Sequence, residues 1–402
     1  MEEWKEYKYT ELCTLIGGGT PKTSEASYWG GDIPWLSVKD FGTDRKYVYT
    51  TEKTITKDGL EKSSTKLLQK DDIIISARGT IGAMAMIVYP MAFNQSCFGI
   101  RGNDLVDKDF LYYLTKTKIA ELQKNSHGSV FETITRDTFA KLSCIVPPLK
   151  KQEEISSILS SLDSKIEVNR RINENLEQQA QALFKSWFVD FEPFKDQPFV
   201  ESELGMIPQG WRVVSLDNLM TYNGGSQPPA SEFIDHYEDG YIRFIQIRDY
   251  ASDGHITYIP ISKRNKLCDV RDIMIARYGA SLGRICYGLK GAYNVALAKV
   301  TPVKEYYLEY LRCFLNTREF YEGINNKGNR AVQAGFNQSD IQSFRIAFPG
   351  KEEILMRFED TCSRLFDMRL KNEQESHRLA ELRDTLLPKL MSGEINVNEV
   401  KI

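Results

Sequence analysis

The residues that come nearest to a chemical site in this sequence are three glycines at 17–19, followed by Thr20, Pro21 and Lys22. Glycines and a lysine could cradle a phosphate, but a P-loop places its lysine directly after the last glycine. Pro21 stands between them and removes an N–H donor that such a loop uses. The G-x-G-x-x-G pattern of a dinucleotide site also fails, because no further glycine follows until Gly30. The stretch is therefore predicted to be a tight turn in which the glycines supply positive φ angles.

No other set of residues has the spacing of a catalytic or metal site. The seven cysteines are odd in number and form no C-x-x-C pair, and the four histidines form no H-E-x-x-H or H-x-x-x-H pair. This usage is typical of reduced thiols in a cytoplasm and indicates neither disulfides nor zinc. An N-P-P-Y or D-P-P-Y tetrapeptide, a glycine-rich S-adenosylmethionine loop, a Walker motif and a nuclease carboxylate cluster are all absent. We therefore expect no catalytic residue and no metal or cofactor bound by this chain.

The composition is that of a globular protein with two or three domains. The chain has 402 residues, of which 42% are hydrophobic and 27% charged. No apolar run approaches the ~20 residues that span a bilayer, and the first ten residues are too polar for a secretory signal. We therefore expect a cytoplasmic protein that does not enter a membrane. The net charge is −3, but Lys and Arg outnumber Asp and Glu within residues 206–348, so a local nucleic-acid-binding face is permitted.

The chain repeats itself with a period of about half its length, which is the organisation that must position any site. IPWLSVKDF (33–41) recurs as IRFIQIRDY (242–250), DDIIISARGTIG (71–82) as RDIMIARYGASLG (271–283), and AFNQSCFGI (92–100) as AYNVALAKV (292–300). IGGGTPKTS is answered by YNGGSQPPAS, which keeps two glycines and has no lysine. The repeat predicts two similar mixed α/β domains. Their loop side chains differ, which indicates either two related ligands or drift after gene duplication.

Each repeat ends in a long helical pattern. Apolar residues recur in steps of four and three from Ile155 to Trp187 and, at an offset of 199 positions, from Ile354 to Leu386. This spacing is typical of a coiled-coil seam, in which a single asparagine commonly fixes the register, and Asn173 and Asn372 hold equivalent seam positions. The alternative is two amphipathic helices that pack only on their own domains.

Several stretches together carry a resemblance to a known family over essentially the whole chain. They are GGTPKTSEASYWGGDIPWLSVKDF (18–41), SARGTIG (76–82), LFKSWFVDFEPF (183–194), SELGMIPQGW (202–211) and LLPKLMSGEI (386–395). The chain resembles the specificity subunit of type I restriction-modification enzymes. The resemblance implies two target-recognition domains that each read half of a split site in double-stranded DNA. It also implies docking of two methyltransferase subunits and of restriction motor-nuclease subunits, which would carry S-adenosylmethionine, ATP and Mg. The second opening loop, NGGSQPPASEF, departs from the family's usual form.

The expected fold class is α+β, with two similar mixed α/β target-recognition domains separated by two long helices that form an antiparallel coiled coil. The expected segments are a first recognition domain (1–147), a first spacer helix (148–195), a linker (196–210), a second recognition domain (206–348), a second spacer helix (350–392) and a C-terminal tail (393–402).

The candidate DNA-binding residues share loop positions or strand ends and side chains suited to base or phosphate contacts. In the first domain they are Thr20, Lys22, Lys39, Arg78, Thr80, Asn94 and Gln95. In the second they are Ser226, Gln227, Arg248, Arg277, Tyr278, Ser281 and Arg284. For each of them an ordinary surface or turn role is the alternative. Arg78 and Arg277 are favoured because each follows a strand end close to a glycine.

An aromatic cluster at the end of the first helical pattern is the candidate docking site for a methyltransferase subunit, because aromatic residues dominate interface hot spots. Its members are Phe184, Trp187, Phe188, Phe191 and Phe194. The alternative is local packing against a recognition domain. For the whole chain the alternative to a DNA reader is a coiled-coil scaffold whose two globular ends bind proteins.

Overall fold

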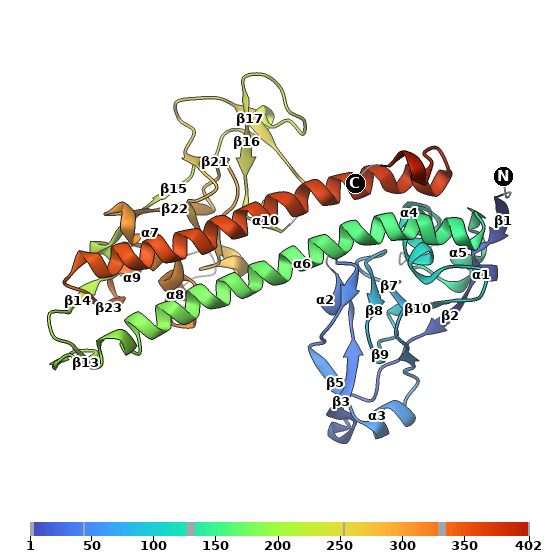
Figure 1. Ribbon diagram of the computed structural model, residues 1–402, viewed down its shortest axis with the longest axis horizontal. Coiled ribbons are helices and arrows are strands. Elements are labelled where there is room, and N and C mark those ends of the chain that lie inside the picture. The colour runs from blue at the N-terminus through green and yellow to red at the C-terminus, as the bar shows by residue number, and fades with distance from the viewer. Residues whose placement is uncertain (1–3, 43–44, 127–132, 252–253, 329–334, 401–402) are drawn as a thin grey trace. The chain divides into compact units, whose positions relative to one another are not determined.

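The computed structural model describes residues 4–42, 45–126, 133–251, 254–328 and 335–400. The chain divides into two compact units (Figure 1). Unit 1 comprises residues 1–169 and 375–402, and unit 2 comprises residues 170–374.

Unit 1 contains a five-stranded sheet and a four-stranded sheet. The first has the order β2 (Cys13–Gly17), β10 (Cys97–Gly102), β7 (Ile73–Ser76), β8 (Met84–Ile87) and β4 (Tyr47–Val48). The second has the order β5 (Lys53–Ile55), β3 (Trp29–Leu36), β9 (Met91–Phe93) and β6 (Leu67–Leu68). A separate antiparallel pair joins β1 (Lys5–Lys8) to β11 (Ser143–Val146). Unit 1 also contains the helices α1 (Tyr9–Leu12), α2 (Val38–Phe41), α3 (Lys57–Glu61), α4 (Lys108–Ser126) and α5 (Arg136–Ala140).

Unit 2 repeats this plan. One four-stranded sheet has the order β15 (Met220–Gly224), β22 (Leu297–Pro302), β19 (Ile273–Ala276) and β20 (Ile285–Cys286). The other has the order β17 (Tyr258–Pro260), β16 (Tyr241–Ile245), β21 (Gly291–Tyr293) and β18 (Leu267–Cys268). The pair β14 (Arg212–Ser215) and β23 (Arg345–Phe348) corresponds to β1 and β11. Its short helices are α7 (Leu308–Leu315), α8 (Arg318–Gly328) and α9 (Gln338–Gln342).

The central strands explain why the apolar runs of the two repeats are continuous. Every residue of β7 and of β19 is buried, because both faces of these strands are covered by protein. Alternation between apolar and polar residues is expected only where one face meets water.

Two long helices complete the fold: α6 (Leu149–Phe188) and α10 (Glu352–Ser392). They pair antiparallel, since residue numbers fall along one helix as they rise along the other. Within unit 1 Arg383 Nη1 lies 2.6 Å from Asp163 Oδ1. Within unit 2 the Nδ2 group of Asn372 donates to Oδ1 of Asn173 over 2.9 Å. The predicted α+β class with two antiparallel long helices is confirmed, and the two seam asparagines do meet.

The predicted seam is correct for α6 and partly wrong for α10. Thr361, Met368 and Leu382 are exposed. Phe358 of the predicted seam is buried, but the buried line of α10 in unit 2 otherwise runs through other apolar residues of its own domain core, namely Leu355, Cys362, Phe366 and Leu370. The reason is that this helix packs against a globular domain as well as a partner helix. Its sequence therefore contains two adjacent lines of apolar residues, one for each contact.

The end of α6 and the segment that follows it also differ from the expectation. Helix α6 stops at Phe188, because Phe191 adopts a left-handed conformation with φ 53° before Pro193. Residues 196–210 were expected to be a linker, but they contain a hairpin of β12 (Phe199–Ser202) and β13 (Gly205–Pro208). Helix α10 passes through Pro388 and ends at Ser392, before Gly393 with φ 76°.

Candidate nucleic-acid interface

The glycine turns at the ends of β2 and β15 are fixed by close approach of the backbone. A Cβ atom on Gly18 would lie 2.0 Å from the carbonyl oxygen of Asn94, and one on Gly225 would lie 2.1 Å from that of Asn294. None of the glycines at 17–19 has a positive φ, so that expectation was wrong. A side chain is excluded here by the neighbouring turn and not by the conformation of the glycine itself.

Backbone hydrogen bonds bring three loops of unit 1 together beside this turn. The Gly19 N–H donates to the carbonyl of Phe93 (3.0 Å), and the Ala77 N–H donates to that of Ser96 (2.8 Å). The Ile134 N–H, just before α5, donates to the carbonyl of Ala77 (3.0 Å). The glycine turn, the β9–β10 turn, the β7–β8 turn and the segment entering α5 therefore form one surface, which we call the loop cluster of unit 1.

Most of the candidates in the first domain lie at this loop cluster. Arg78, Thr80 and Gln95 are exposed there, and the hydroxyl of Thr20 donates to the side chain of Gln95. The side chain of Asn94 accepts the N–H of Ser96 over 3.1 Å, so part of its role is to hold the turn.

Two further candidates lie beside the loop cluster. Lys22 is exposed in a turn, and its backbone carbonyl accepts the indole N–H of Trp29 (3.2 Å). Lys39 is exposed on α2. That helix is tied to the cluster because the Asn94 N–H donates to the carbonyl of Leu36 over 3.0 Å.

Unit 2 builds an equivalent loop cluster with different side chains. The Ser226 N–H donates to the carbonyl of Tyr293 (3.1 Å) and the Arg277 N–H to that of Ala296 (2.8 Å). These bonds place Ser226, Gln227, Arg277 and Tyr278 on one surface. Asn294 holds its turn as Asn94 does, by accepting the N–H two residues later over 3.2 Å.

The other candidates of the second domain form a separate group. Arg284 Nη2 donates to the carbonyl of Tyr250 over 3.5 Å, which places Arg284 next to the short helical turn that carries Arg248. Ser281 and Arg284 also line a hollow together with Arg318 and Tyr321. Arg318 and Tyr321 have no counterpart among the sequence candidates.

Strand register shows that the two favoured arginines are not equivalent. Cys97 pairs with Ser76 and Leu297 with Ala276, so Arg277 corresponds to Ala77, and Tyr278 corresponds to Arg78. Each strand end thus presents a different residue at each position, although the sequence pattern of the two turns is alike.

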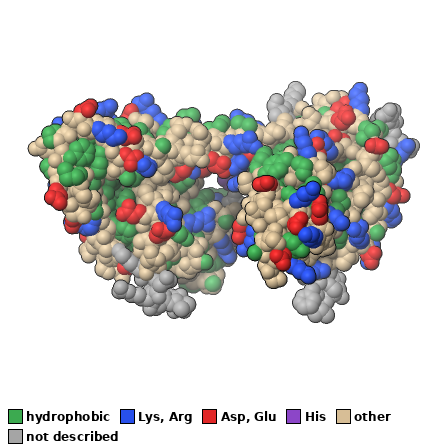
Figure 2. Space-filling view, turned by 90° about the horizontal axis from the view of Figure 1, so that it is seen from below, with side chains coloured by type: hydrophobic (Ala, Val, Ile, Leu, Met, Phe, Trp, Pro, Cys, Tyr) green, Lys and Arg blue, Asp and Glu red, His purple; other side chains and the backbone are tan. Residues whose placement is uncertain are grey.

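The electrostatics of the unit 2 cluster centre on Arg277. Its Cζ atom lies 5.1 Å from the ring centroid of Tyr278. Burial raises the pKa of Tyr222, and the nearby Arg277 guanidinium opposes that rise. Over the face shown in Figure 2, Lys and Arg side chains are interspersed with Asp and Glu. On the face shown there, binding of a polyanion would depend on individually placed cations and not on a broad basic field.

The aromatic cluster at the end of α6 lies in the core of unit 2. Phe184, Phe188 and Phe194 are buried, whereas Trp187 and Phe191 are partly buried. The ring of Phe188 lies 4.8 Å from that of Tyr310 and 4.9 Å from that of Phe358. Local packing thus accounts for the three buried rings.

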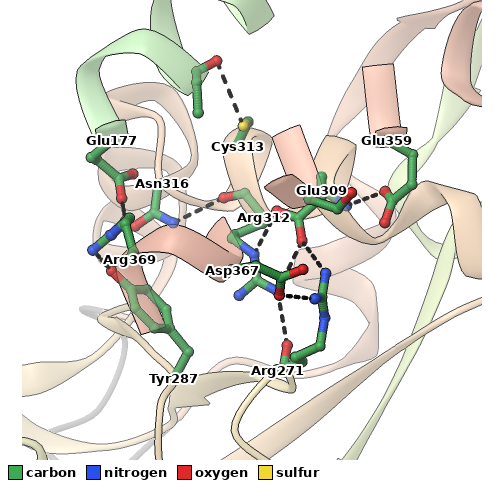
Figure 3. Close-up of polar contacts among 12 residues, drawn as sticks. Glu177, Arg271, Tyr287, Glu309, Arg312, Cys313, Asn316, Glu359, Asp367 and Arg369 are labelled. Carbon is green, nitrogen blue, oxygen red and sulfur yellow. Dashed lines mark hydrogen bonds and ion pairs between the residues drawn. The ribbon is translucent and has the colours of Figure 1, made fainter. Parts of the chain in front are cut away.

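Sequence reasoning missed the buried ion pairs of both units. In unit 2 Arg312 Nε lies 2.8 Å from Glu309 Oε2 and Nη2 lies 2.8 Å from the carbonyl of Arg271 (Figure 3). In unit 1 Lys46 Nζ lies 2.6 Å from Asp109 Oδ1. The i,i+3 spacing of Glu309 and Arg312 is a local signal for an ion pair, but their burial depends on the tertiary fold. Lys46 and Asp109 come from separate elements, so no local pattern signals that pair.

Arg136 at the start of α5 was also missed. It is exposed and its Cζ atom lies 6.0 Å from the ring centroid of Phe98. The signal that could have found it is the alignment of the capping residues Thr135 and Asn337, which pairs Arg136 with Gln338.

Across the described residues, no group of three or more His, Cys, Asp and Glu side chains is arranged to hold a metal ion. None of the helices in the described part of the chain has the length and apolar character needed to cross a membrane.

Comparisons with known proteins give a consistent family. The model of the family described as "Type I restriction modification DNA specificity domain" matches residues 1–178. The MjaIX specificity subunit of Methanocaldococcus jannaschii is 31% identical over 99% of this chain and 95% of its own length. The HindI specificity subunit of Haemophilus influenzae is 26% identical over 73% of this chain and 78% of its own. The crystal structure of the type I S subunit from M. genitalium covers 97% of this chain and 96% of its own, with a TM-score of 0.54 at 16% identity. That last likeness supports the fold.

Proposed function

Because the chain belongs to the DNA specificity subunits of type I restriction-modification enzymes, we propose that its two units read the two halves of one split site in double-stranded DNA. The chain is non-catalytic, and S-adenosylmethionine, ATP and Mg belong to the modification and restriction subunits. Those subunits are its partners in the assembled enzyme. The proposal places it in a cytoplasm, where its seven buried thiols stay reduced.

The observation that carries the proposal is the repeated loop cluster. Both units hold the same turns together by equivalent backbone hydrogen bonds, yet they present different side chains there. A rigid backbone with variable polar side chains is what base reading in the major groove requires. The sequence candidates of each domain are proposed as contacts on this basis. Gln95, Arg78 and Thr80 lead as base contacts in unit 1, and Gln227 and Tyr278 lead in unit 2.

Docking of two methyltransferase subunits is proposed on the outer faces of α6 and α10. Among the aromatic candidates, Trp187 and Phe191 are the two that are not fully buried, so they are the ones we retain for this role. Phe184, Phe188 and Phe194 would act indirectly, by holding the end of α6 against unit 2.

Selection from a pool of random duplex DNA tests the proposal. The chain assembled with its methyltransferase subunits should enrich two short half-sites separated by a gap of fixed length and free sequence. Exchange of residues 1–147 for the same segment of a relative should then change one half-site and leave the other intact. Absence of any enrichment would contradict DNA reading and favour the protein scaffold, and a change in both half-sites would contradict the assignment of one unit to one half-site.

A further inference from the structure

The first glycines of the two turns are structurally equivalent. Gly17 pairs with Phe98 across β2 and β10, and Gly224 pairs with Ala298 across β15 and β22. Phe98 directly follows Cys97, which pairs with Ser76 at the end of β7. Ala298 directly follows Leu297, which pairs with Ala276 at the end of β19. The two glycines therefore occupy the same place in each unit.

A guanidinium group lies close to the position that a Cβ atom would take on each of these glycines. A Cβ atom on Gly17 would lie 3.9 Å from Nη2 of Arg136, and one on Gly224 would lie 2.7 Å from Nη1 of Arg277. Arg136 reaches this place from the start of α5, whereas Arg277 reaches it from the end of β19. The two units therefore deliver the same chemical group to the same location from different elements.

Two sequence positions could supply this guanidinium group, and the arginine lies at a different one of them in each unit. Unit 1 has Ala77 at the strand end and Arg136 at the helix start, and unit 2 has Arg277 and Gln338 at the equivalent positions. Ala77 has no side chain long enough to reach the place in front of Gly17, and Arg136 supplies the guanidinium there. Each unit thus carries one arginine and one uncharged residue at this pair of positions.

An aromatic ring supports each guanidinium. Arg136 leans over Phe98 at 6.0 Å and Arg277 over Tyr278 at 5.1 Å, both measured from Cζ to the ring centroid. The Nε atom of Arg277 is buried and has no hydrogen-bond partner among the described residues. Among the described residues, no carboxylate forms an ion pair with Arg136 or Arg277, which suits their guanidinium groups to an external anion.

We infer that Arg136 and Arg277 each bind a DNA phosphate, at a contact point common to the two half-sites. This inference rests on the proposed function. Residues that differ between the units at matched positions, such as Arg78 and Tyr278, are suited to reading half-sites of different sequence. A group kept at one location, even though its residue has moved, must bind what both half-sites share, and that is the sugar-phosphate backbone.

The test uses the assembled methyltransferase complex, with affinity for its selected duplex measured over a range of salt concentrations. Arg136→Gln and Arg277→Gln should each weaken binding by roughly tenfold and lower the salt slope by about one. The weakening should be uniform, so that the ratio of affinities for the selected site and for single-base variants stays within about twofold. Arg78→Gln is the matched control. It removes a neighbouring exposed arginine and should alter base preference in one half-site.

A second pair of variants tests the shared location itself. In the background of Arg277→Ala, the added change Gln338→Arg should restore the salt slope, because it rebuilds in unit 2 the arrangement of unit 1. Arg136→Lys should keep the slope and lose part of the affinity, since a lysine retains charge without the planar fork. Unchanged thermal unfolding and unchanged complex assembly establish that each variant is folded.

The outcomes separate this inference from the proposed function. If the wild-type complex enriches a split site while Arg136→Gln leaves affinity and slope unchanged, the phosphate contact is wrong and DNA reading stands. A change of base preference by Arg136→Gln, with no change of slope, would also overturn it. Failure of Gln338→Arg to restore the slope would overturn the common location. Lack of enrichment by the wild-type complex would instead remove the proposed function.

Discussion

The two helix–domain junctions occupy equivalent positions in the repeat, yet one is ionic and the other aromatic. In unit 1 Arg383 of α10 pairs with Asp163 of α6, and the hydroxyl of Tyr113 donates to the same carboxylate over 2.5 Å. At the positions 199 residues away, unit 2 has Phe184 for Arg383 and Cys362 for Asp163. Phe184 packs on Tyr310 at 5.3 Å, and Tyr310 corresponds to Tyr113.

The two units thus bury side chains at the same positions of the repeat, but these side chains differ in polarity. Unit 2 buries its own charges at positions where unit 1 has neutral side chains. Glu309 and Arg312 stand where unit 1 has Tyr112 and Thr115. In both units each buried charge has a partner, because an unpaired one costs several kcal/mol. The two repeats therefore hold two packing solutions for one backbone plan.

The largest effect should come from breaking the ionic junction. Arg383→Leu strands the Asp163 carboxylate, whose side chain is only 4% exposed, and should cost about 3–5 kcal/mol in the stability of unit 1. Urea unfolding, assigned to unit 1 by hydrogen exchange in α4, measures the loss. Adding Asp163→Asn removes the stranded charge and keeps an acceptor for Tyr113, so it should recover more than half. Equal losses in the single and double variants would show that charge is not the cause.

The aromatic junction should be more tolerant. Phe184→Leu replaces a buried ring that is 3% exposed by a smaller apolar side chain and strands no charge. It should cost about 1–1.5 kcal/mol in the stability of unit 2, measured by the same unfolding experiment with hydrogen exchange in α7. A loss as large as that of Arg383→Leu would mean that the two junctions do not differ in kind.

The asparagine pair joins equivalent positions of the two helices and belongs to neither kind of junction. Asn173 accepts from Asn372 and donates to the carbonyl of Arg369 over 3.2 Å. Asn173→Ala should therefore cost about 1 kcal/mol, read from thermal unfolding. Asn175→Ala is the matched control on the exposed face of α6, and it should change stability by less than about 0.5 kcal/mol. Equal changes in the two variants would show that the pairing adds no stability.

The last effect depends on pH and concerns a carboxylate that only unit 2 has. Glu359 accepts the N–H of Glu309 over 2.8 Å, and Ser160 holds the equivalent position in unit 1. Burial raises the pKa of Glu359 from its ordinary 4.5 to about 7. Between these values the folded state binds the proton more tightly, so this group makes stability fall as pH rises from 4.5 to 7.

Glu359→Gln should remove that contribution while it keeps an acceptor for the Glu309 N–H. The measurement is the unfolding free energy of unit 2 from pH 5 to pH 8. The wild-type chain should lose more stability over that interval than the variant does. Parallel curves would contradict the raised pKa.

The sequence by itself determined the repeat, the α+β class, the two long helices, the asparagine pair and the family. These features are written in local patterns: apolar runs for buried strands, four-and-three spacing for helices, and glycines where two turns touch. Such patterns can be recognised in the sequence because each depends on residues close together in the chain.

Only the tertiary structure decided which side chains share a surface. It matched Tyr278 and not Arg277 to Arg78, brought Arg136 beside Gly17, and paired Arg383 with Asp163. It also buried three of the five aromatic residues for which docking and local packing were both open. The physical reason is that these neighbours are set by strand register and helix packing between segments far apart in the chain, and no local spacing encodes them.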